Sequence, residues 1–571
     1  MECAPSPELP TSSPPPETVP KSAAATAAPW WRRPLLVCAE GAVAMFTALV
    51  FAIWARNIRV NPINRIGQVS GLATLQLRMT LISLLVIAAL VIAYRRFGPT
   101  LQALVVRLSC AVVAGLATGF VAGGTTIGLR GTPWPINGVG GDVGTLANWA
   151  GAINRGESIP SGVYPPLFPE FLALWAKVLR GGNTSYALQD MQILLMAMIG
   201  PAAYLAWRLW FQPLWALAIG VTSSIPLYEP IKPYTTIVLV VFVPVIAKFI
   251  QVLRRSPQMS QRDRLVTGAA FGVMLGVMMI AYSGWFVWSA AGVLVTCLLV
   301  LPWRRGFKSA LVFLGATLVP FLLISGLYLK DLLLKGGGEK DSYFYFDTKV
   351  DPAYFLMWRS DTPGEVGMWP PPGELGGVGV FMLILLVGLA VALALGMRRS
   401  LVLALVACLA SSWLMRFWFA SHMFQNDAVQ LYPRTSIELA YVMLLLVGVA
   451  VHLSAQRMRS LWNRFVVHRA DPATEVEPMH VGARWRTTPG MSTTIGALAA
   501  MALLFGIAAS SVSDDIMPVD DTSIGSLTFR SHQLQKTNGE CPRYAKNHKC
   551  QRLGTPPWKS PVHGTPGAKS G

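Results

Sequence analysis

Residues 103–126 read ALVVRLSCAVVAGLATGFVAGGTT, a continuously apolar run interrupted by one charged residue, Arg107. About 20 apolar residues are enough to carry an α-helix across the hydrocarbon core of a bilayer. The strands of a membrane barrel would instead alternate apolar and polar residues, and this run does not alternate. The stretch therefore predicts a transmembrane helix.

Runs of the same kind recur along the whole chain, which is 53% hydrophobic and only 13% charged. They predict an all-α polytopic membrane protein with about thirteen transmembrane helices. The predicted spans are 35–54, 77–95, 103–126, 187–209, 213–227, 233–252, 264–282, 284–302, 308–330, 377–397, 400–420, 436–455 and 493–512. Their number depends on the short run 213–227 and on whether Ser283-Gly284 separates two spans. Glu40, inside the first span, is expected to face protein or water, because a carboxylate in hydrocarbon is costly.

Basic residues in short loops predict the orientation of the chain, because such loops stay on the cytoplasmic side. With the N-terminus inside, almost all basic clusters fall on that side. They are Arg32-Arg33, Arg95-Arg96, Arg254-Arg255 with Arg262 and Arg264, Arg304-Arg305 with Lys308, Arg398-Arg399, and Arg457, Arg459, Arg464, Arg484 and Arg486. The exception is the loop that holds Arg56, Arg59 and Arg65. The prediction is a multi-pass protein of the plasma membrane whose working face is extracytoplasmic. That face comprises the loops 127–186, 331–376 and 421–435 and the tail 513–571.

The segments outside the apolar core have distinct compositions. Residues 1–34 predict a disordered cytoplasmic tail, without the basic start and apolar centre of a signal peptide. Residues 35–455 form the transmembrane core, 456–492 a basic cytoplasmic linker, 493–512 the last transmembrane helix and 513–571 an extracytoplasmic tail. Cys541 and Cys550 close a short polar loop in that tail, where an oxidising compartment favours a disulfide over a metal pair.

The loop 127–186 is patterned rather than linker-like. Gly140-Gly141-Asp142 predicts a tight turn, and apolar residues at helical spacing from Val143 to Asn154 predict a short amphipathic helix on the membrane surface. Tyr164-Pro165-Pro166 breaks the chain, and Phe168 to Val178 predicts a second apolar helix. A carboxylate in this aqueous loop has no packing role, so Asp142 is a candidate for catalysis. It is equally suited to cap the helix that begins at Val143.

The arrangement of many spans with an acid in an early outside loop resembles the GT-C class of integral-membrane glycosyltransferases, which use polyprenyl-phosphate sugars. Within that class, Asp142 before an amphipathic helix, Tyr164-Pro165-Pro166-Leu167-Phe168, and Leu431-Tyr432-Pro433-Arg434-Thr435-Ser436 before a span resemble the actinobacterial galactan arabinofuranosyltransferase family. The resemblance implies decaprenyl-phospho-arabinofuranose as donor and a cell-wall galactan as acceptor. It also implies that Asp142 is the general base of an inverting transfer.

Such a transfer requires a base for the acceptor hydroxyl and cations for the departing phosphate. Arg434 at the outer end of a span and Lys232 in an outside turn are the candidates for binding the phosphate. Each has a simpler role: Arg434 can reach lipid head groups, and Lys232 can pair with Glu229. His422, Asp427 and Tyr432 in the third outside loop, and Tyr164 in the first, are candidates for contacting substrate. Tyr164 is equally suited to anchor the chain at the membrane interface.

Other partners and functions are less well supported by the sequence. The net charge of +19 is concentrated in juxtamembrane loops, so lipid and topology explain it without nucleic acid. No close pair of acids accompanies Asp142, so a divalent metal has no support and no cofactor is predicted. The segment 331–376 fits a lid, a substrate platform or a structural cap. Three alternative functions remain. They are the transfer of another sugar such as mannose, transport or flipping of a lipid-linked sugar, and a non-catalytic role as an assembly partner.

Overall fold

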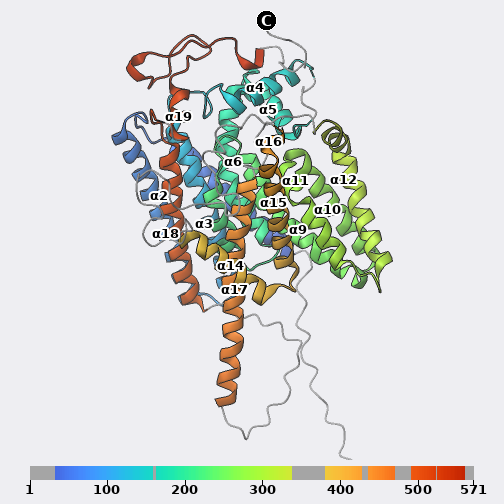
Figure 1. Cartoon of the computed structure of the whole chain (residues 1–571). Helices are drawn as coiled ribbons and strands as arrows, with labels where there is room; N and C mark the ends of the chain where they lie inside the picture. Colours follow the sequence, from blue (N-terminus) through green and yellow to red (C-terminus); the bar gives the residue numbers. More distant parts are fainter. Residues whose placement is uncertain are drawn as a thin grey trace, which may run out of the picture.

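The computed structural model describes residues 32–157, 163–336, 380–426, 435–469, 490–521 and 524–559 (Figure 1). Within these ranges every regular element is a helix, and the only bridge between extended residues joins Leu534 and Gln551. The elements are α1 (Arg32–Ala55), α2 (Arg65–Arg96), α3 (Pro99–Gly128), α4 (Gly141–Asn154), α5 (Leu167–Leu179), α6 (Thr184–Trp207), α7 (Pro213–Ala216), η1 (Leu217–Val221), α8 (Thr222–Ser224), η2 (Ile225–Leu227), α9 (Pro233–Arg255), η3 (Ser256–Gln258), α10 (Gln261–Ala281), α11 (Gly284–Val300), α12 (Phe307–Lys335), α14 (Val380–Gly396), α15 (Ser400–Ser421), α16 (Met423–Asn426), α17 (Thr435–Arg469), α18 (Met491–Ile516), α19 (Ile524–His532), η6 (Lys546–His548) and η7 (Pro557–Lys559).

Ten of these helices are long and apolar enough to cross a bilayer, so the chain is an all-helical polytopic membrane protein. They are α1, α2, α3, α6, α9, α10, α12, α15, α17 and α18. Each overlaps a span expected from the sequence, but α2 begins at Arg65 rather than at 77, and α17 continues to Arg469, into the expected linker 456–492. The other three expected spans coincide with shorter apolar helices, Pro213–Leu227, Gly284–Val300 and Phe381–Gly396.

The first of these shorter stretches, Pro213–Leu227, contacts a longer helix at each of its ends. The hydroxyl of Thr236, at the start of α9, donates to the carbonyl of Leu227 over 3.0 Å, which fixes the end of the stretch 213–227 there. At the other end of that stretch the ring of Trp215 lies 4.5 Å from His452 of α17. Its middle is a π-helix, η1, and its end is the 3₁₀-helix η2, so it is irregular over most of its length.

The close packing of α10 against α12 depends on three glycines spaced one turn apart. A Cβ on Gly272 would lie 2.2 Å from the carbonyl oxygen of Thr317, and one on Gly268 or Gly276 would also touch α12. Apolar side chains gain little by leaving lipid for another helix, so helices in a membrane associate through close backbone contact at small residues. The Gly268, Gly272 and Gly276 stripe is therefore what allows these two helices to approach.

Replacing Gly272 with Leu is expected to destabilise the protein by about 1–3 kcal/mol, because the added side chain must push α12 away from α10. Thermal unfolding of the purified protein in detergent measures this effect. Gly315→Leu on α12 is the matched control, since a Cβ at Gly315 meets nothing within 4 Å. Equal transitions for the two variants would show that the close approach of α10 and α12 does not contribute to stability.

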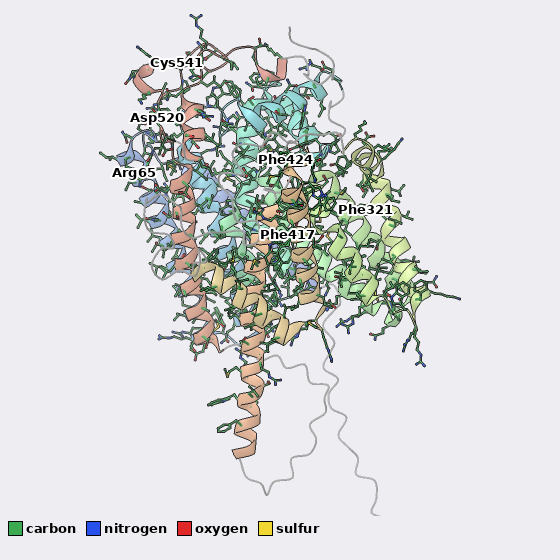
Figure 2. The ribbon with its side chains drawn as sticks, in the orientation of Figure 1. Arg65, Phe321, Phe417, Phe424, Asp520 and Cys541 are labelled. Atoms are coloured by element: carbon green, nitrogen blue, oxygen red, sulfur yellow. A yellow bond between two sulfur atoms is a disulfide. The ribbon has the colours of Figure 1, made fainter. Side chains whose placement is uncertain are left out.

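The two ends of the helix bundle differ in chemistry. At the end where α9 finishes, Arg254 donates to the carbonyl of Arg398 over 3.0 Å, and Arg399 donates to Gln456 over 3.1 Å. Basic clusters that lie far apart in the sequence thus share one end. The opposite end carries α4, α5, α16 and α19 (Figure 1), and Arg65, Asp520 and Cys541 lie towards that end in Figure 2.

Arg65, part of the exception to the orientation pattern, has a specific partner. Its guanidinium holds the carboxylate of Asp514 on α18 through two contacts, at 2.6 and 3.2 Å. Arg130 similarly donates to the carbonyls of Arg56 and Ile58. An acidic partner at this end therefore accounts for Arg65 on the side opposite the other basic clusters.

Glu40 in α1 is buried and fully paired. Its two oxygens accept from Arg208 at 2.7 Å, from the hydroxyl of Tyr204 at 2.8 Å and from Arg107 at 3.1 Å. This carboxylate therefore faces protein, as expected, and links α1 to α3 and to the end of α6.

Candidate functional site

Asp142 lies in the first turn of α4, which begins two residues earlier than the sequence predicted. The preceding turn has Asn137 and Gly141 at positive φ, +73° and +52°, and the Asn137 amide donates to the Gly140 carbonyl over 3.0 Å. Gly140 occupies the N-cap position and no side chain caps the helix. The expectation that Asp142 caps a helix beginning at Val143 is therefore wrong. The helix starts from the Gly140-Gly141 turn without a side chain that accepts from its first N–H groups. The Asp142 carboxylate can therefore bind another partner.

That partner is Lys232. The ammonium of Lys232 lies 2.5 Å from the Asp142 carboxylate, and the two side chains are 18% and 47% exposed. Lys232 is the residue before α9, with Pro230 and Pro233 on either side restricting the backbone of the turn. The sequence alternatives for Lys232 were phosphate and Glu229, and its ion pair in the structure is instead with Asp142.

Gln192 of α6 holds in place both the turn that precedes α4 and the turn that precedes α9. Its buried amide accepts from the backbone N–H of Ile136 at 2.9 Å and donates to the carbonyl of Ile231 at 3.2 Å. Glu229 accepts from the N–H of Ile231 at 3.2 Å. Burial raises the pKa of Glu229 above its usual range, and the charge of Lys232 opposes that rise. Glu229 thus serves the backbone of the turn and leaves the ammonium to Asp142.

An aromatic cluster adjoins this ion pair. We define it as Trp149, Tyr164, Phe168, Tyr234 and Tyr282. The rings of Trp149 and Tyr164 lie 4.5 Å apart, those of Phe168 and Tyr234 are stacked at 4.0 Å, and the hydroxyls of Tyr164 and Tyr234 are hydrogen-bonded. Val143, next to Asp142, packs in the same group of apolar residues. Tyr164, a candidate substrate contact, is therefore partly buried and linked to the ion pair through Tyr234, two residues after Lys232.

A second polar group lies where α15 and α17 meet. Arg416 is fully buried and donates to Ser436 at 2.9 Å and to Thr435 at 3.3 Å. Glu438 is also fully buried and accepts from Ser289 of α11. The sequence interpretation missed both residues because they fall inside or at the edge of apolar spans. A charge within an apolar run was the signal that could have found them.

Helix α11 lies between the two polar groups. Trp285 donates from its indole to the carbonyl of Thr235 over 2.8 Å, close to Lys232 in sequence. One turn further along α11, Ser289 reaches Glu438. The first turns of α11 therefore connect the turn that carries Lys232 with the buried Arg416 and Glu438.

The third outside loop is only partly described. His422 follows the last residue of α15, where its Nδ1 lies 2.8 Å from the Trp418 carbonyl and its half-buried ring stacks 4.0 Å from Trp418. These contacts keep His422 on its own helix. The candidate residues Asp427, Tyr432 and Arg434 lie outside the described residues, as does almost all of the segment 331–376.

The C-terminal tail folds back over the first loop. Trp558 covers Gly151 of α4, where a Cβ would lie 2.6 Å from the Trp558 backbone. The indole of Trp134 donates to the carbonyl of Leu534 over 3.1 Å, and Tyr186 bonds to Thr537 over 3.1 Å. The helix that carries Asp142 is therefore held between the α6 side of the bundle and the tail.

A disulfide joins Cys541 to Cys550, whose Cα atoms are 5.6 Å apart. Replacing both residues with Ser is expected to lower the local stability of the tail by about 2–3 kcal/mol, because the open loop gains conformational freedom when unfolded. Hydrogen exchange of residues 533–551 measures the effect. Cys38→Ser, at an exposed free cysteine of α1, is the control. Unchanged exchange in the double variant would contradict this role of the disulfide.

An exposed carboxylate beside a less exposed ammonium can accept a proton and bind an anion within one site. Among the described residues, no group of three or more His, Cys, Asp or Glu is placed to hold a metal ion. A scan of known protein families found no match to this chain. A search of curated proteins found no match either.

Proposed function

We propose that this protein is a membrane glycosyltransferase of the GT-C type that moves a sugar from a polyprenyl phosphate to a glycan hydroxyl. The observation that supports this most is the 2.5 Å contact between Asp142 and Lys232 beside an aromatic cluster. A sugar on a lipid phosphate already has a good leaving group. The protein needs a base for the acceptor and a cation for the phosphate, and this pair provides one of each.

In the proposed reaction the acceptor oxygen attacks the anomeric carbon and forms the new glycosidic bond. The bond from that carbon to the phosphate oxygen breaks, and its electron pair leaves with the lipid phosphate. Asp142 takes the acceptor proton, and direct attack inverts the anomeric centre. In the free protein Lys232 is paired with Asp142. When phosphate binds, the ammonium turns to the phosphate and leaves the carboxylate free to accept the proton.

The proposed donor is a polyprenyl-phospho-arabinofuranose and the proposed acceptor a cell-wall galactan, as the motif resemblance implies. His422, Asp427, Tyr432 and Arg434 are retained in this proposal as substrate and phosphate contacts. Tyr164 is assigned a contact with the sugar or the prenyl chain, on the strength of its place in the aromatic cluster beside the ion pair. The aromatic faces and the phenol fit a partner that is partly apolar and partly polar.

The proposed topology has about thirteen passes, with the N-terminus in the cytoplasm and Asp142 outside the plasma membrane. The disulfide in the tail supports this orientation, since disulfides persist in oxidising compartments. A cysteine-free variant given Asp142→Cys is expected to react with a membrane-impermeant maleimide in intact cells. The same background with Arg457→Cys, at the opposite end of the bundle, is expected to be protected. The reverse labelling pattern would overturn the orientation.

The transfer itself is tested with purified protein, a galactan acceptor and two donors, polyprenyl-phospho-arabinofuranose and polyprenyl-phospho-mannose. Wild-type protein is expected to transfer arabinose, and Asp142→Ala to transfer neither sugar. Transfer of mannose alone would reassign the donor while keeping the reaction. If wild-type protein transfers neither sugar while the donor is bound, the protein is not a transferase for these substrates.

Two features favour a lipid-linked-sugar flippase as a second candidate. Arg416 and Glu438 are charged residues buried on helices that can cross the membrane, and the stretch Pro213–Leu227 is irregular, as broken transporter helices are. Proteoliposomes with a fluorescent polyprenyl-phosphate lipid distinguish the two. A flippase moves the lipid between leaflets without an acceptor, and its Asp142→Ala variant still does so. A transferase does not move the lipid between leaflets, with or without the substitution.

A further inference from the structure

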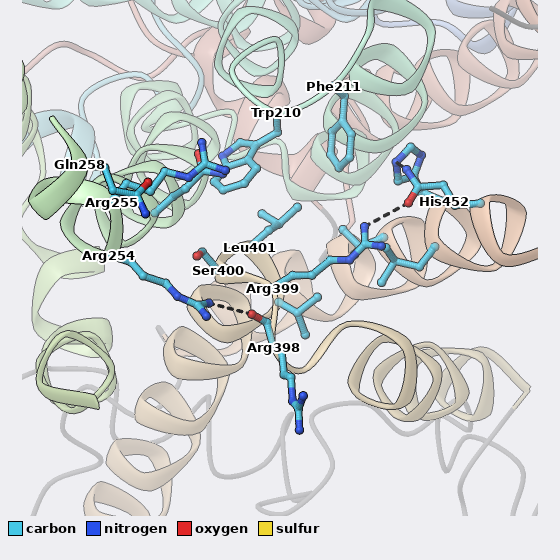
Figure 3. Close-up of a pocket in the computed structure, with 15 residues that line it drawn as sticks. Trp210, Phe211, Arg254, Arg255, Gln258, Arg398, Arg399, Ser400, Leu401 and His452 are labelled. Atoms are coloured by element: carbon cyan, nitrogen blue, oxygen red, sulfur yellow. Dashed lines mark hydrogen bonds between the residues drawn. The ribbon is translucent and has the colours of Figure 1, made fainter. Parts of the chain in front are cut away.

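Figure 3 shows a pocket with a basic rim. It lies at the end of the bundle where α9 finishes, opposite the end that carries α4 and Asp142 (Figure 1). It has a volume of about 550 Å³ and is formed by the turn between α6 and α7, the last turn of α9, the turn between α14 and α15, and α17. Segments from four parts of the sequence therefore converge on one concavity.

The charges on this pocket are all of one sign. Arg254, Arg255, Arg398 and Arg399 line it, and within the part of the chain that the structure describes none of its lining residues is Asp or Glu. The hydrogen bonds that these arginines make within the pocket are to neutral acceptors, from Arg254 to the Arg398 carbonyl and from Arg399 to Gln456. Neutral acceptors leave the positive charge uncompensated, so the pocket attracts an anion.

The floor of the pocket is apolar and aromatic. Trp210 and Phe211 form one side, and Leu401 and Val449 contribute aliphatic surface. His452 stands at the edge with its ring 4.9 Å from Phe211, and its buried Nδ1 has no hydrogen-bond partner among the described residues. An apolar floor beneath a cationic rim suits a ligand with a charged head and an apolar body.

Topology alone does not account for this arrangement. Arginines that merely keep a loop in the cytoplasm need only lie near the membrane, as the exposed Arg262 and the half-buried Arg264 do at the start of α10. Here Arg254 and Arg399 come from different loops and surround one pocket together with His452. Guanidinium groups match phosphate oxygens in pairs, so two arginines from different elements can hold one phosphate from two sides.

We propose that this pocket binds the phosphate of an anionic phospholipid from the leaflet opposite the Asp142 face. The arginines hold the phosphate, and Trp210 and Phe211 contact the glycerol and the start of the acyl chains. Basic pockets between membrane helices are suited to such head groups. The pocket is separate from the proposed transfer site, so a result against one proposal does not contradict the other.

The test uses full-length protein purified in zwitterionic detergent and titrated with short-chain phosphatidylglycerol, phosphatidylcholine or inorganic phosphate. Bound lipid is counted by native mass spectrometry. We expect one phosphatidylglycerol to bind at least about tenfold more tightly than phosphatidylcholine. The double variant Arg254→Gln and Arg399→Gln is expected to lose that preference. The matched variant Arg262→Gln and Arg264→Gln, with the same change in charge at the same end, is expected to keep it.

Three results would overturn the proposal. Equal loss in the two double variants would mean diffuse attraction by surface charge. No preference for phosphatidylglycerol in the wild-type protein would remove the site altogether. Complete displacement of the lipid by millimolar inorganic phosphate would assign the pocket to a free phosphate compound instead. The wild-type comparison decides the question even if the Arg254 and Arg399 variant fails to fold.

Discussion

Replacing Asp142 with Asn is expected to lower the kcat of sugar transfer by about 10²- to 10⁴-fold, the usual contribution of a positioned general base. The amide has nearly the size and shape of the carboxylate but cannot take the acceptor proton at neutral pH. The KM for the lipid donor is expected to stay the same or fall, because Lys232 no longer has a competing carboxylate and is free to bind phosphate. Steady-state kinetics over a range of donor concentrations separate the two parameters.

Two further variants make the Asp142 result specific. Thr145 lies on the same exposed turn, and among the described residues its hydroxyl donates only to the Gly141 carbonyl, at 3.3 Å. Thr145→Ala is therefore expected to transfer sugar at nearly the wild-type rate. Asp142→Glu keeps a carboxylate but moves it by one methylene, and is expected to retain part of the activity. An Asp142→Asn enzyme with wild-type kcat would reject the general-base assignment.

Replacing Lys232 with Met is expected to lower kcat/KM for the lipid donor by roughly 10²- to 10³-fold, as loss of a group that stabilises developing charge does. The thioether chain fills similar space without the ammonium, so the phosphate would leave with its charge uncompensated. Lys232→Arg keeps the charge and is expected to retain more activity than Lys232→Met. Thermal unfolding checks that each variant is folded, since Lys232 is only 18% exposed.

A double-mutant cycle with Asp142→Asn and Lys232→Met tests whether the two side chains act in one step. Groups that serve the same transition state lose activity in a strongly non-additive way. The double variant is therefore expected to be little worse than the poorer single variant. Losses that simply multiply would mean that the 2.5 Å contact in the free protein has no part in the reaction.

The helices were predictable because each depends on a local property, an apolar run of sufficient length. The helices expected at 143–154 and 168–178 correspond to α4 (Gly141–Asn154) and α5 (Leu167–Leu179), with ends displaced by one or two residues. The start of α4 was misjudged because Gly141, at a φ of +52°, begins the helix without a capping side chain. Patterns of apolar spacing carry no information on such a start.

The contacts within the candidate site were harder to predict than the loops that carry its residues. Asp142 and Lys232 were each chosen from the sequence, but their pairing was not foreseen. Glu229, only three residues from Lys232, was the side chain weighed against phosphate as its partner. The backbone turn instead uses Glu229 to accept from Ile231, and Gln192 brings the turn towards α4. Arg416 was overlooked because a single charge inside an apolar run hardly changes the prediction of a span.

The amino-acid sequence alone was enough to predict that this chain crosses the membrane many times, which loops are basic, and which outside loop carries the Asp142 carboxylate. These are properties of composition over short windows, and the free energy of burying apolar residues in lipid depends on little else. The packing of the helices was needed to show that Lys232 contacts Asp142, that Glu438 is buried against Ser289 of α11, and that arginines from separate loops surround one pocket. Those contacts join residues far apart in the chain, so they depend on how the helices pack against one another.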